Sequence, residues 1–88
     1  MTVRITSDVQ GGRTIIRVEG KLTAIDTSVL VAKCRSAGFP QRLDLSGLQS
    51  ADRAGIAALR SLQSEGAVLR GASPYLRRLL EEEEWRQS

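Results

Sequence analysis

The sequence contains no histidine and only one cysteine, Cys34, among its 88 residues. A single cysteine excludes a disulfide within the chain, and without histidine the chain cannot assemble a Cys/His metal site. The lack of histidine also removes the most common general base, which argues against hydrolytic catalysis. We predict that Cys34 packs as a small apolar side chain on a helix rather than acting as a reactive thiol.

Aromatic residues and long apolar runs are also scarce. Aromatic residues make up 3% of the chain, so Val, Ile, Leu and Ala must build the core. No apolar run reaches the length of a membrane span, and residues 1–5 lack the apolar stretch of a signal peptide. We therefore expect a cytoplasmic protein without membrane insertion, folded as one domain over residues 1–88.

Charge and motif content exclude further classes of function. The chain has 13 basic and 10 acidic residues, a net charge of +3, and its basic residues are spread along the sequence and do not form a cluster with aromatic residues. Such a distribution argues against a nucleic-acid partner. No two aspartates stand at a spacing diagnostic of catalysis, and no glycine-rich phosphate loop of the Walker or dinucleotide type is present. We predict that the protein is not an enzyme and needs no cofactor.

The first part of the chain predicts an antiparallel hairpin. Residues 2–8 and 14–19 alternate apolar and polar side chains, as half-buried strands do, and the turn signal Gln10-Gly11-Gly12 separates them. Ile15 falls on the side opposite the other apolar residues of its strand. Either the sheet is covered on both faces there, or this isoleucine is exposed.

The rest of the chain alternates helices and strands. We expect a helix from Thr23 or Asp26 to about Ala37, ended by Gly38-Phe39-Pro40; a strand over residues 42–46; a helix from Asp52 to about Ser64; a strand over residues 67–70; and a last helix started by Ser73 and Pro74. This order predicts an α/β fold, a small mixed sheet of about four strands with helices packed on it. Its shared core is predicted to include Leu43, Leu45, Ile56, Leu59, Leu69 and Leu79.

The segment from Leu43 to Leu59 carries the strongest functional signal. It reads as a short buried strand, a Gly/Ser loop, and an Ala/Leu-rich helix that Asp52 opens as N-cap. Donors at such a helix start form a compact polar site that can stabilise an anion or receive a partner. Gly55 either permits the close approach of a partner or lets the helix pack tightly on the strand below it.

The same segment resembles the signature of the anti-sigma factor antagonist (STAS) family. The resemblance rests on Asp-Leu-Ser-Gly-Leu at residues 44–48, on Asp52, and on Gly-Ile-Ala-Ala-Leu at residues 55–59. Residues 18–22 resemble the family's second strand, and residues 68–74 resemble its last strand and the start of its final helix. Together these matches imply the STAS fold over nearly the whole chain.

One departure from the family affects regulation. The usual motif of the family is Asp-Ser-Ser-Gly, in which the second serine accepts phosphate, whereas residues 52–55 here are Asp, Arg, Ala and Gly. Ala54 has no hydroxyl and cannot be phosphorylated. Either the chain binds its partner permanently, or its partner is not a serine kinase. Phosphorylation at Ser46 or Ser50 instead is a further alternative.

The resemblance implies a regulatory protein-binding function. We expect the partner-binding surface at Ser46, Gly47, Gln49, Ser50, Asp52, Arg53, Ala54, Gly55 and Ile56, with Thr23 and Asp26 beside it. The family implies an anti-sigma factor, of the serine-kinase type, as partner. One alternative is an accessory subunit that docks on the ATPase of a lipid-transport ABC complex, and another is a scaffold unit of a sensory assembly.

Overall fold

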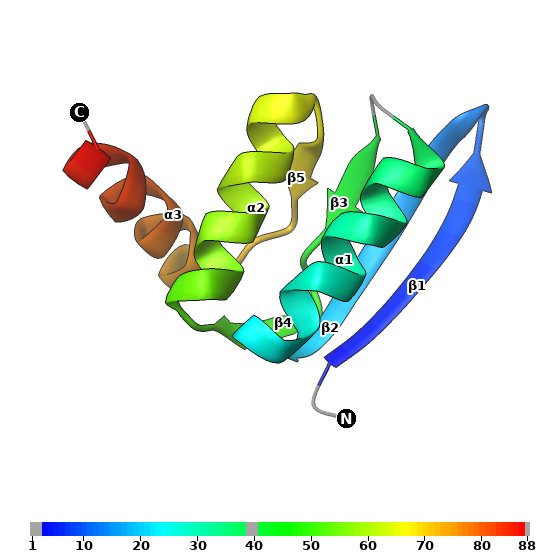
Figure 1. The fold of residues 1–88 in the computed structure, drawn as a ribbon. Coiled ribbons are helices and arrows are strands. Elements are labelled where there is room, and N and C mark those ends of the chain that lie inside the picture. The colour runs from blue at the N-terminus through cyan, green and yellow to red at the C-terminus, as the bar shows by residue number, and fades with distance from the viewer. Residues whose placement is uncertain (1–2, 39–40, 88) are drawn as a thin grey trace.

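The computed structural model describes residues 3–38 and 41–87, with side chains described as far as residue 81. Its elements are β1 (Val3–Gln10), β2 (Arg13–Leu22), α1 (Ala24–Ala37), β3 (Arg42–Asp44), β4 (Leu48–Ala51), α2 (Arg53–Glu65), β5 (Val68–Arg70) and α3 (Pro74–Gln87) (Figure 1). The predicted element order is confirmed, apart from one additional strand. Thr2, Phe39 and Pro40, which belonged to predicted elements or stop signals, lie outside the described residues.

The strands form one mixed sheet. Its order is β1-β2-β3-β5, with β4 also paired to β2. β1 runs antiparallel to β2 across a two-residue turn, in which Gly11 and Gly12 have φ angles of 58° and 79° that favour glycine. β3 is parallel to β2, with α1 in the connection between them, and β5 is parallel to β3, with α2 in the connection between them. The predicted hairpin and parallel pair are therefore confirmed.

A fifth strand, β4, adds to the predicted sheet of about four strands, and it lies between the turn at residues 46–47 and α2, where no strand was predicted. β3 pairs with the first half of β2, and β4 pairs with its second half, with a register shift within the β2–β4 pairing between Gly20 and Lys21. The two short strands thus act as one strand interrupted by a turn, which the Leu48 amide closes by donating to the Leu45 carbonyl (3.0 Å). Backbone pairing with β2 places this segment in the sheet although most of its side chains are small or polar.

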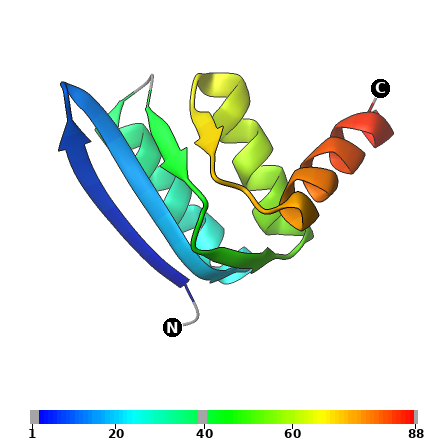
Figure 2. The same ribbon diagram turned by 180° about the vertical axis from the view of Figure 1, so that it is seen from behind.

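Two helices cover one face of the sheet. α1 and α2 lie side by side on this face, and α3 packs beside α2 (Figures 1 and 2). No helix in the described part of the chain covers the opposite face (Figure 2). Ile15 is partly exposed on that uncovered face, which resolves the alternative that the sequence left open.

The core between the helices and the sheet is aliphatic. Its buried residues are Val3, Ile16, Val18, Leu22, Leu30, Cys34, Leu43, Leu45, Leu48, Ile56, Leu59, Leu62, Ala67 and Leu76. Leu69 and Leu79 are partly buried and pack against this cluster. The six predicted core residues therefore do share one core.

The buried side of α1 does not extend to the end of the helix. Leu30 and Cys34 are buried, but Ala37 in the last turn is exposed, because the contact of the helix with the core ends one turn earlier. Burial, followed by the nearby Glu65 carboxylate, raises the pKa of Cys34 to about 11. The thiol therefore stays protonated at neutral pH and packs as an apolar side chain, as predicted.

Polar contacts fix the ends of the helices. At the C-terminal ends of α1 and α2, Arg35 Nη2 donates to Glu65 Oε2 (3.0 Å) and Arg35 Nε to Oε1 (3.4 Å). The hydrogen bond from Arg35 lowers the pKa of Glu65. At the start of α3, the Leu76 amide donates to Ser73 Oγ (3.2 Å), which confirms the predicted serine cap.

Candidate functional site

The carboxylate of Asp52 joins the N-terminal ends of two helices. Its Oδ1 accepts a hydrogen bond from the Gly55 amide of α2 (2.8 Å), and its Oδ2 accepts one from the Ala24 amide of α1 (3.0 Å). The first contact confirms the predicted N-cap, and the side chain remains exposed as expected. The second contact was not predicted. One negative charge thus satisfies two helix starts, where each helix dipole favours an anion.

The side chain that accepts the capping hydrogen bond at the start of α1 is not the predicted one. Thr23 occupies the N-cap position, but its side chain makes no capping hydrogen bond. Thr23 Oγ1 instead donates to Asp26 Oδ2 (3.3 Å), and the Asp26 amide donates to the Thr23 carbonyl (2.9 Å). The capping acceptor that the sequence places at Thr23 or Asp26 is therefore supplied by Asp52 from the next helix.

Close packing beneath α2 explains Gly55. A Cβ atom at this position would lie 2.8 Å from the Leu22 carbonyl oxygen and 3.1 Å from Ala51 Cβ. Gly55 therefore allows the helix to pack tightly on the strands, which is one of its two predicted roles. Ile56 beside it is also buried, at 3% exposure. Of the predicted surface, these two residues position the helix start and do not present side chains to solvent.

The remaining predicted residues around the helix starts are accessible. Arg53, the first residue of α2, is exposed and forms no ion pair with any residue in the described ranges. Ala54 is partly exposed next to it. We call the accessible group the helix-cap surface; it consists of Thr23, Asp26, Asp52, Arg53 and Ala54.

The hydrogen bonds of Ser46 and Gly47 connect them to residues outside the helix-cap surface. Asp44 Oδ1 accepts hydrogen bonds from both the amide (3.0 Å) and the hydroxyl (2.7 Å) of Ser46. These bonds, and to a smaller extent Arg17, lower the pKa of Asp44. The Gly47 carbonyl accepts a bond from the Gly20 amide (3.0 Å). Ser46 is thus held at the end of β3, while in β4 Gln49 is exposed and Ser50 partly exposed.

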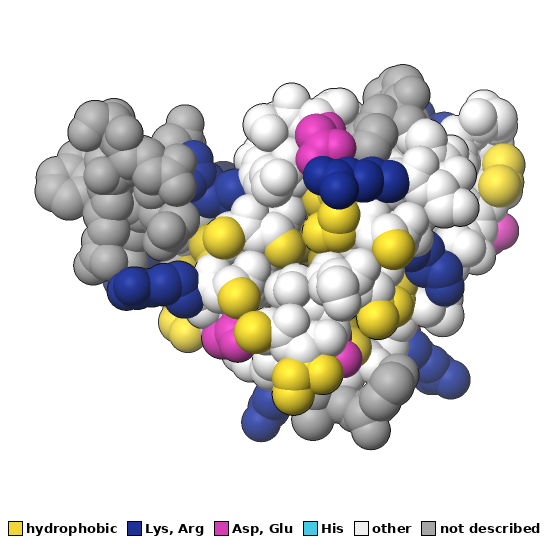
Figure 3. Space-filling view, viewed as in Figure 1, with side chains coloured by type: hydrophobic (Ala, Val, Ile, Leu, Met, Phe, Trp, Pro, Cys, Tyr) yellow, Lys and Arg dark blue, Asp and Glu magenta, His cyan; other side chains and the backbone are white. Residues whose placement is uncertain are grey.

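Sequence reasoning missed two apolar side chains beside the helix-cap surface. Ile25 and Val29 on α1 are 85% and 57% exposed, and Ile25 adjoins Asp26 in the chain. Their spacing of four residues places them on one side of the helix, away from the buried Leu30 and Cys34. This spacing in the sequence could have indicated an exposed apolar side of the helix. Apolar side chains reach the surface over the face that α1 and α2 form (Figure 3).

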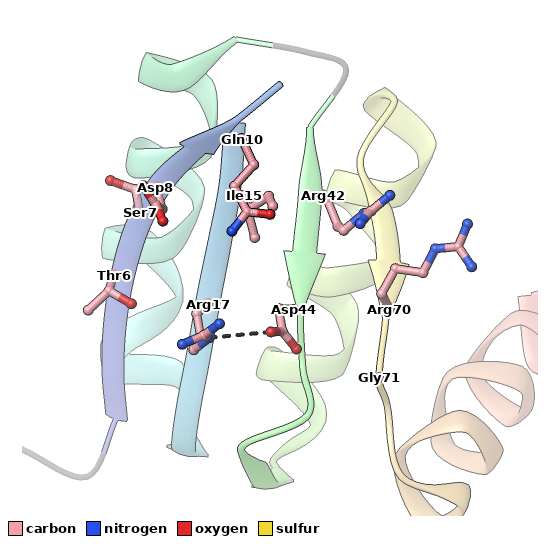
Figure 4. A pocket seen from close by; sticks show the side chains of 10 residues that line it. All are labelled: Thr6, Ser7, Asp8, Gln10, Ile15, Arg17, Arg42, Asp44, Arg70 and Gly71. Carbon is pink, nitrogen blue, oxygen red and sulfur yellow. Dashed lines mark hydrogen bonds and ion pairs between the residues drawn. The ribbon is translucent and has the colours of Figure 1, made fainter. Parts of the chain in front are cut away.

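A polar hollow lies on the uncovered face of the sheet. It encloses about 500 Å³ and is lined by Thr6, Ser7, Asp8, Gln10, Ile15, Arg17, Arg42, Asp44, Arg70 and Gly71 (Figure 4). Arg17 Nε contacts Asp44 Oδ2 at 3.3 Å across adjacent strands. None of the predicted partner-binding residues lines this hollow. The hollow and the predicted partner-binding surface are therefore separate candidate sites.

Two further properties concern ligands and membranes. No group of three or more Cys, Asp or Glu side chains in the described ranges is placed to hold a metal ion. Within the same ranges, none of the helices has the length and apolar character that a membrane crossing requires.

Comparisons with known proteins agree on the fold. The structure resembles a STAS domain of an anti-sigma factor antagonist from Rhodobacter sphaeroides, with a TM-score of 0.61 and 27% identity over 83% of this chain and 94% of that one. It also resembles an uncharacterized protein with a SpoIIAA-like fold from Shewanella loihica, with a TM-score of 0.54 and 13% identity over 96% of this chain and 78% of that one. No protein-family model and no curated protein matches the sequence. The chain therefore has the STAS-like fold that its sequence predicts.

Proposed function

We propose that this chain, which has the fold of STAS domains, is a regulatory protein-binding module of the anti-sigma factor antagonist class. Fold alone does not define function, so the proposal depends on the helix-cap surface. Its supporting observation is the Asp52 carboxylate, which joins α1 and α2 and so fixes accessible polar groups from both helices in one place. A surface of this kind is prepared for docking because it needs little reordering on binding.

The composition of the surface suits a protein partner. Ile25 and Val29 offer exposed apolar area, and Asp26 and Arg53 offer charges of both signs beside it. Protein interfaces commonly combine an apolar centre with a polar rim that provides specificity. We propose that Ile25 and Arg53 contact the partner directly, while Gly55 and Ile56 support the surface from below.

Regulation by phosphate at the start of α2 is proposed to be absent. In the STAS family the phosphate is carried at the position of Ala54, where it adds close to two negative charges to the docking surface. Ala54 is partly exposed but has no hydroxyl, and Arg53 places a cation next to it. The proposed partner is an anti-sigma factor that this chain binds permanently.

The missing acceptor also favours a second candidate function. An accessory subunit that docks on the ATPase of a lipid-transport ABC complex needs no phosphorylation, which fits Ala54 equally well. A scaffold role in a sensory assembly has no comparable observation in its favour. The identity of the captured partner separates the two candidates.

A charge reversal at Arg53 tests the docking surface. We expect tagged wild-type protein to capture a kinase-like anti-sigma factor from extracts of its source cells, and Arg53→Glu to lose at least about 90% of that capture, since buried or rim charges at interfaces control binding strongly. A glutamate in the first turn of α2 interacts favourably with the helix dipole, so the variant should stay folded.

The matched control is Arg13→Glu, which makes the same change at the turn between β1 and β2, far from α2 (Figure 1). It should capture the partner as wild type does. Capture of an ABC ATPase would support the second candidate. Equal capture by Arg53→Glu and wild type would rule out the helix-cap surface as the binding site.

A further inference from the structure

We propose that β1 pairs with β1 of a second copy of this chain, so that two sheets join edge to edge. β1 lies at one edge of the sheet and has no strand on its outer side among the described residues. It is eight residues long, and every residue from Thr6 to Gln10 is exposed. Long, unprotected edge strands are templates for pairing with another chain. This inference does not depend on the proposed function.

The backbone of β1 offers its outward groups in a regular order. Gln10 and Arg13 flank the two-residue turn, and residues in that position form a hydrogen-bonded pair. Even-numbered residues of β1 therefore direct their backbone groups toward β2, and odd-numbered residues direct theirs outward. The Val9 amide agrees with this order, because it donates to the side chain of Asp8 (2.8 Å) instead of to β2.

Charge complementarity selects one register for the pair. In an antiparallel pair with its two-fold axis at Thr6, Arg4 lies opposite Asp8 of the second copy, and the same contact forms again on the other side of the axis. Both side chains are exposed and face the same side of the sheet, as direct cross-strand neighbours must. On β2, Asp8 lies opposite the neutral side chain of Ile15, with Arg13 and Arg17 only diagonal to it, and Arg4 lies opposite Glu19. In this register Asp8 gains a directly opposite cation, and Arg4 stands between two carboxylates.

Other two-fold registers are less favourable. Axes at Arg4 or Asp8 place like charges directly opposite each other, and axes at Ile5 or Ser7 leave both charges opposite neutral residues. The Thr6 register also brings Val9, which is 66% exposed, opposite Val3 of the second copy. On pairing, the Val9 amide exchanges the Asp8 carboxylate for a backbone carbonyl, and Asp8 is released to contact Arg4.

Charge reversal with complementation tests the register. In sedimentation equilibrium, we expect wild type to self-associate, and Arg4→Asp and Asp8→Arg each to weaken association about tenfold or more, because each variant places two like-charged pairs opposite each other. A mixture of the two variants should associate again, since Asp at position 4 then faces Arg at position 8. The double variant should do the same.

A monomeric wild type, or a mixture that associates no better than its components, would overturn the proposal. A strand of another protein as the natural neighbour of β1 would give that monomeric result. Circular dichroism shows whether each variant is folded. Restored association in the mixture also requires that both variants are folded.

Cross-linking gives a second, independent test. Thr6 faces its own copy across the axis as a non-hydrogen-bonded pair, at a Cα separation of about 4.5 Å that suits a disulfide. Thr6→Cys should therefore form a covalent dimer under mild oxidation. Ser7→Cys, which faces Ile5 of the second copy, should not, and the native Cys34 is buried. Equal cross-linking of both variants would overturn this register.

Discussion

Replacing Leu59 with alanine should lower the free energy of unfolding by about 2–5 kcal/mol, because the change removes a buried side chain and leaves a cavity. Leu59 is fully buried on α2 in the cluster that joins the helices to the sheet. A domain of this size is stable by only about 5–15 kcal/mol. The melting temperature should therefore fall by about 10 °C or more.

The matched control for Leu59→Ala is Ile25→Ala, a similar truncation on α1. Ile25 is 85% exposed, so its replacement should change stability by no more than about 0.5 kcal/mol. Urea unfolding, monitored by circular dichroism, measures the free energy of unfolding of both variants. An unchanged dependence of that free energy on urea concentration would show that unfolding exposes a similar surface in each. Equal stabilities of the two variants would contradict the position of Leu59 in the core.

Replacing Asp52 with alanine should cost about 2 kcal/mol, because one carboxylate caps two helices and each cap contributes about 1 kcal/mol. Both capping amides, those of Gly55 and Ala24, lose their acceptor in this variant. Hydrogen exchange should accelerate at the Ala24 amide, although Ala24 lies 28 positions away in the sequence. An ordinary N-cap would affect only its own helix.

Asp52→Asn separates the two contacts of Asp52. The asparagine oxygen can still accept from Gly55, but its amide group cannot accept from Ala24, so about half of the stability loss is expected. If Asp52→Ala costs no more than Asp52→Asn, or if the Ala24 amide exchanges at its wild-type rate, the bridge between α1 and α2 does not contribute to stability.

Asp52→Ala should also weaken partner binding at a temperature where the variant is fully folded. The reason is that the N-terminal ends of α1 and α2, which together carry the helix-cap surface, are no longer held by a common acceptor. Binding equal to wild type under those conditions would mean that Asp52 acts only as a cap.

Elements with local signals could be predicted from the sequence. Asp52 opens α2 and Ser73 opens α3 as predicted, because each capping bond closes within the helix it starts. The alternation in β1 and β2 likewise assigns Val3, Ile16 and Val18 to the core, since side chains of a strand alternate between its faces.

Features that depend on distant parts of the chain could not be predicted. β4 was missed because it is defined by backbone pairing with β2 and has no apolar alternation of its own. The contact between Asp52 and Ala24 was missed because nothing near Ala24 in the sequence shows which side chain will cap α1.

The central claim is that this chain binds its partner without a phosphate switch. The most direct measurement incubates the captured complex with ATP and magnesium, then records the bound fraction and the intact mass of the chain. We expect both to be unchanged, because Ala54 offers no hydroxyl. The variant with Arg53→Ser and Ala54→Ser, which restores the family's serine pair, is the comparison. A phosphate on wild type at Ser46 or Ser50, accompanied by release of the partner, would contradict the claim.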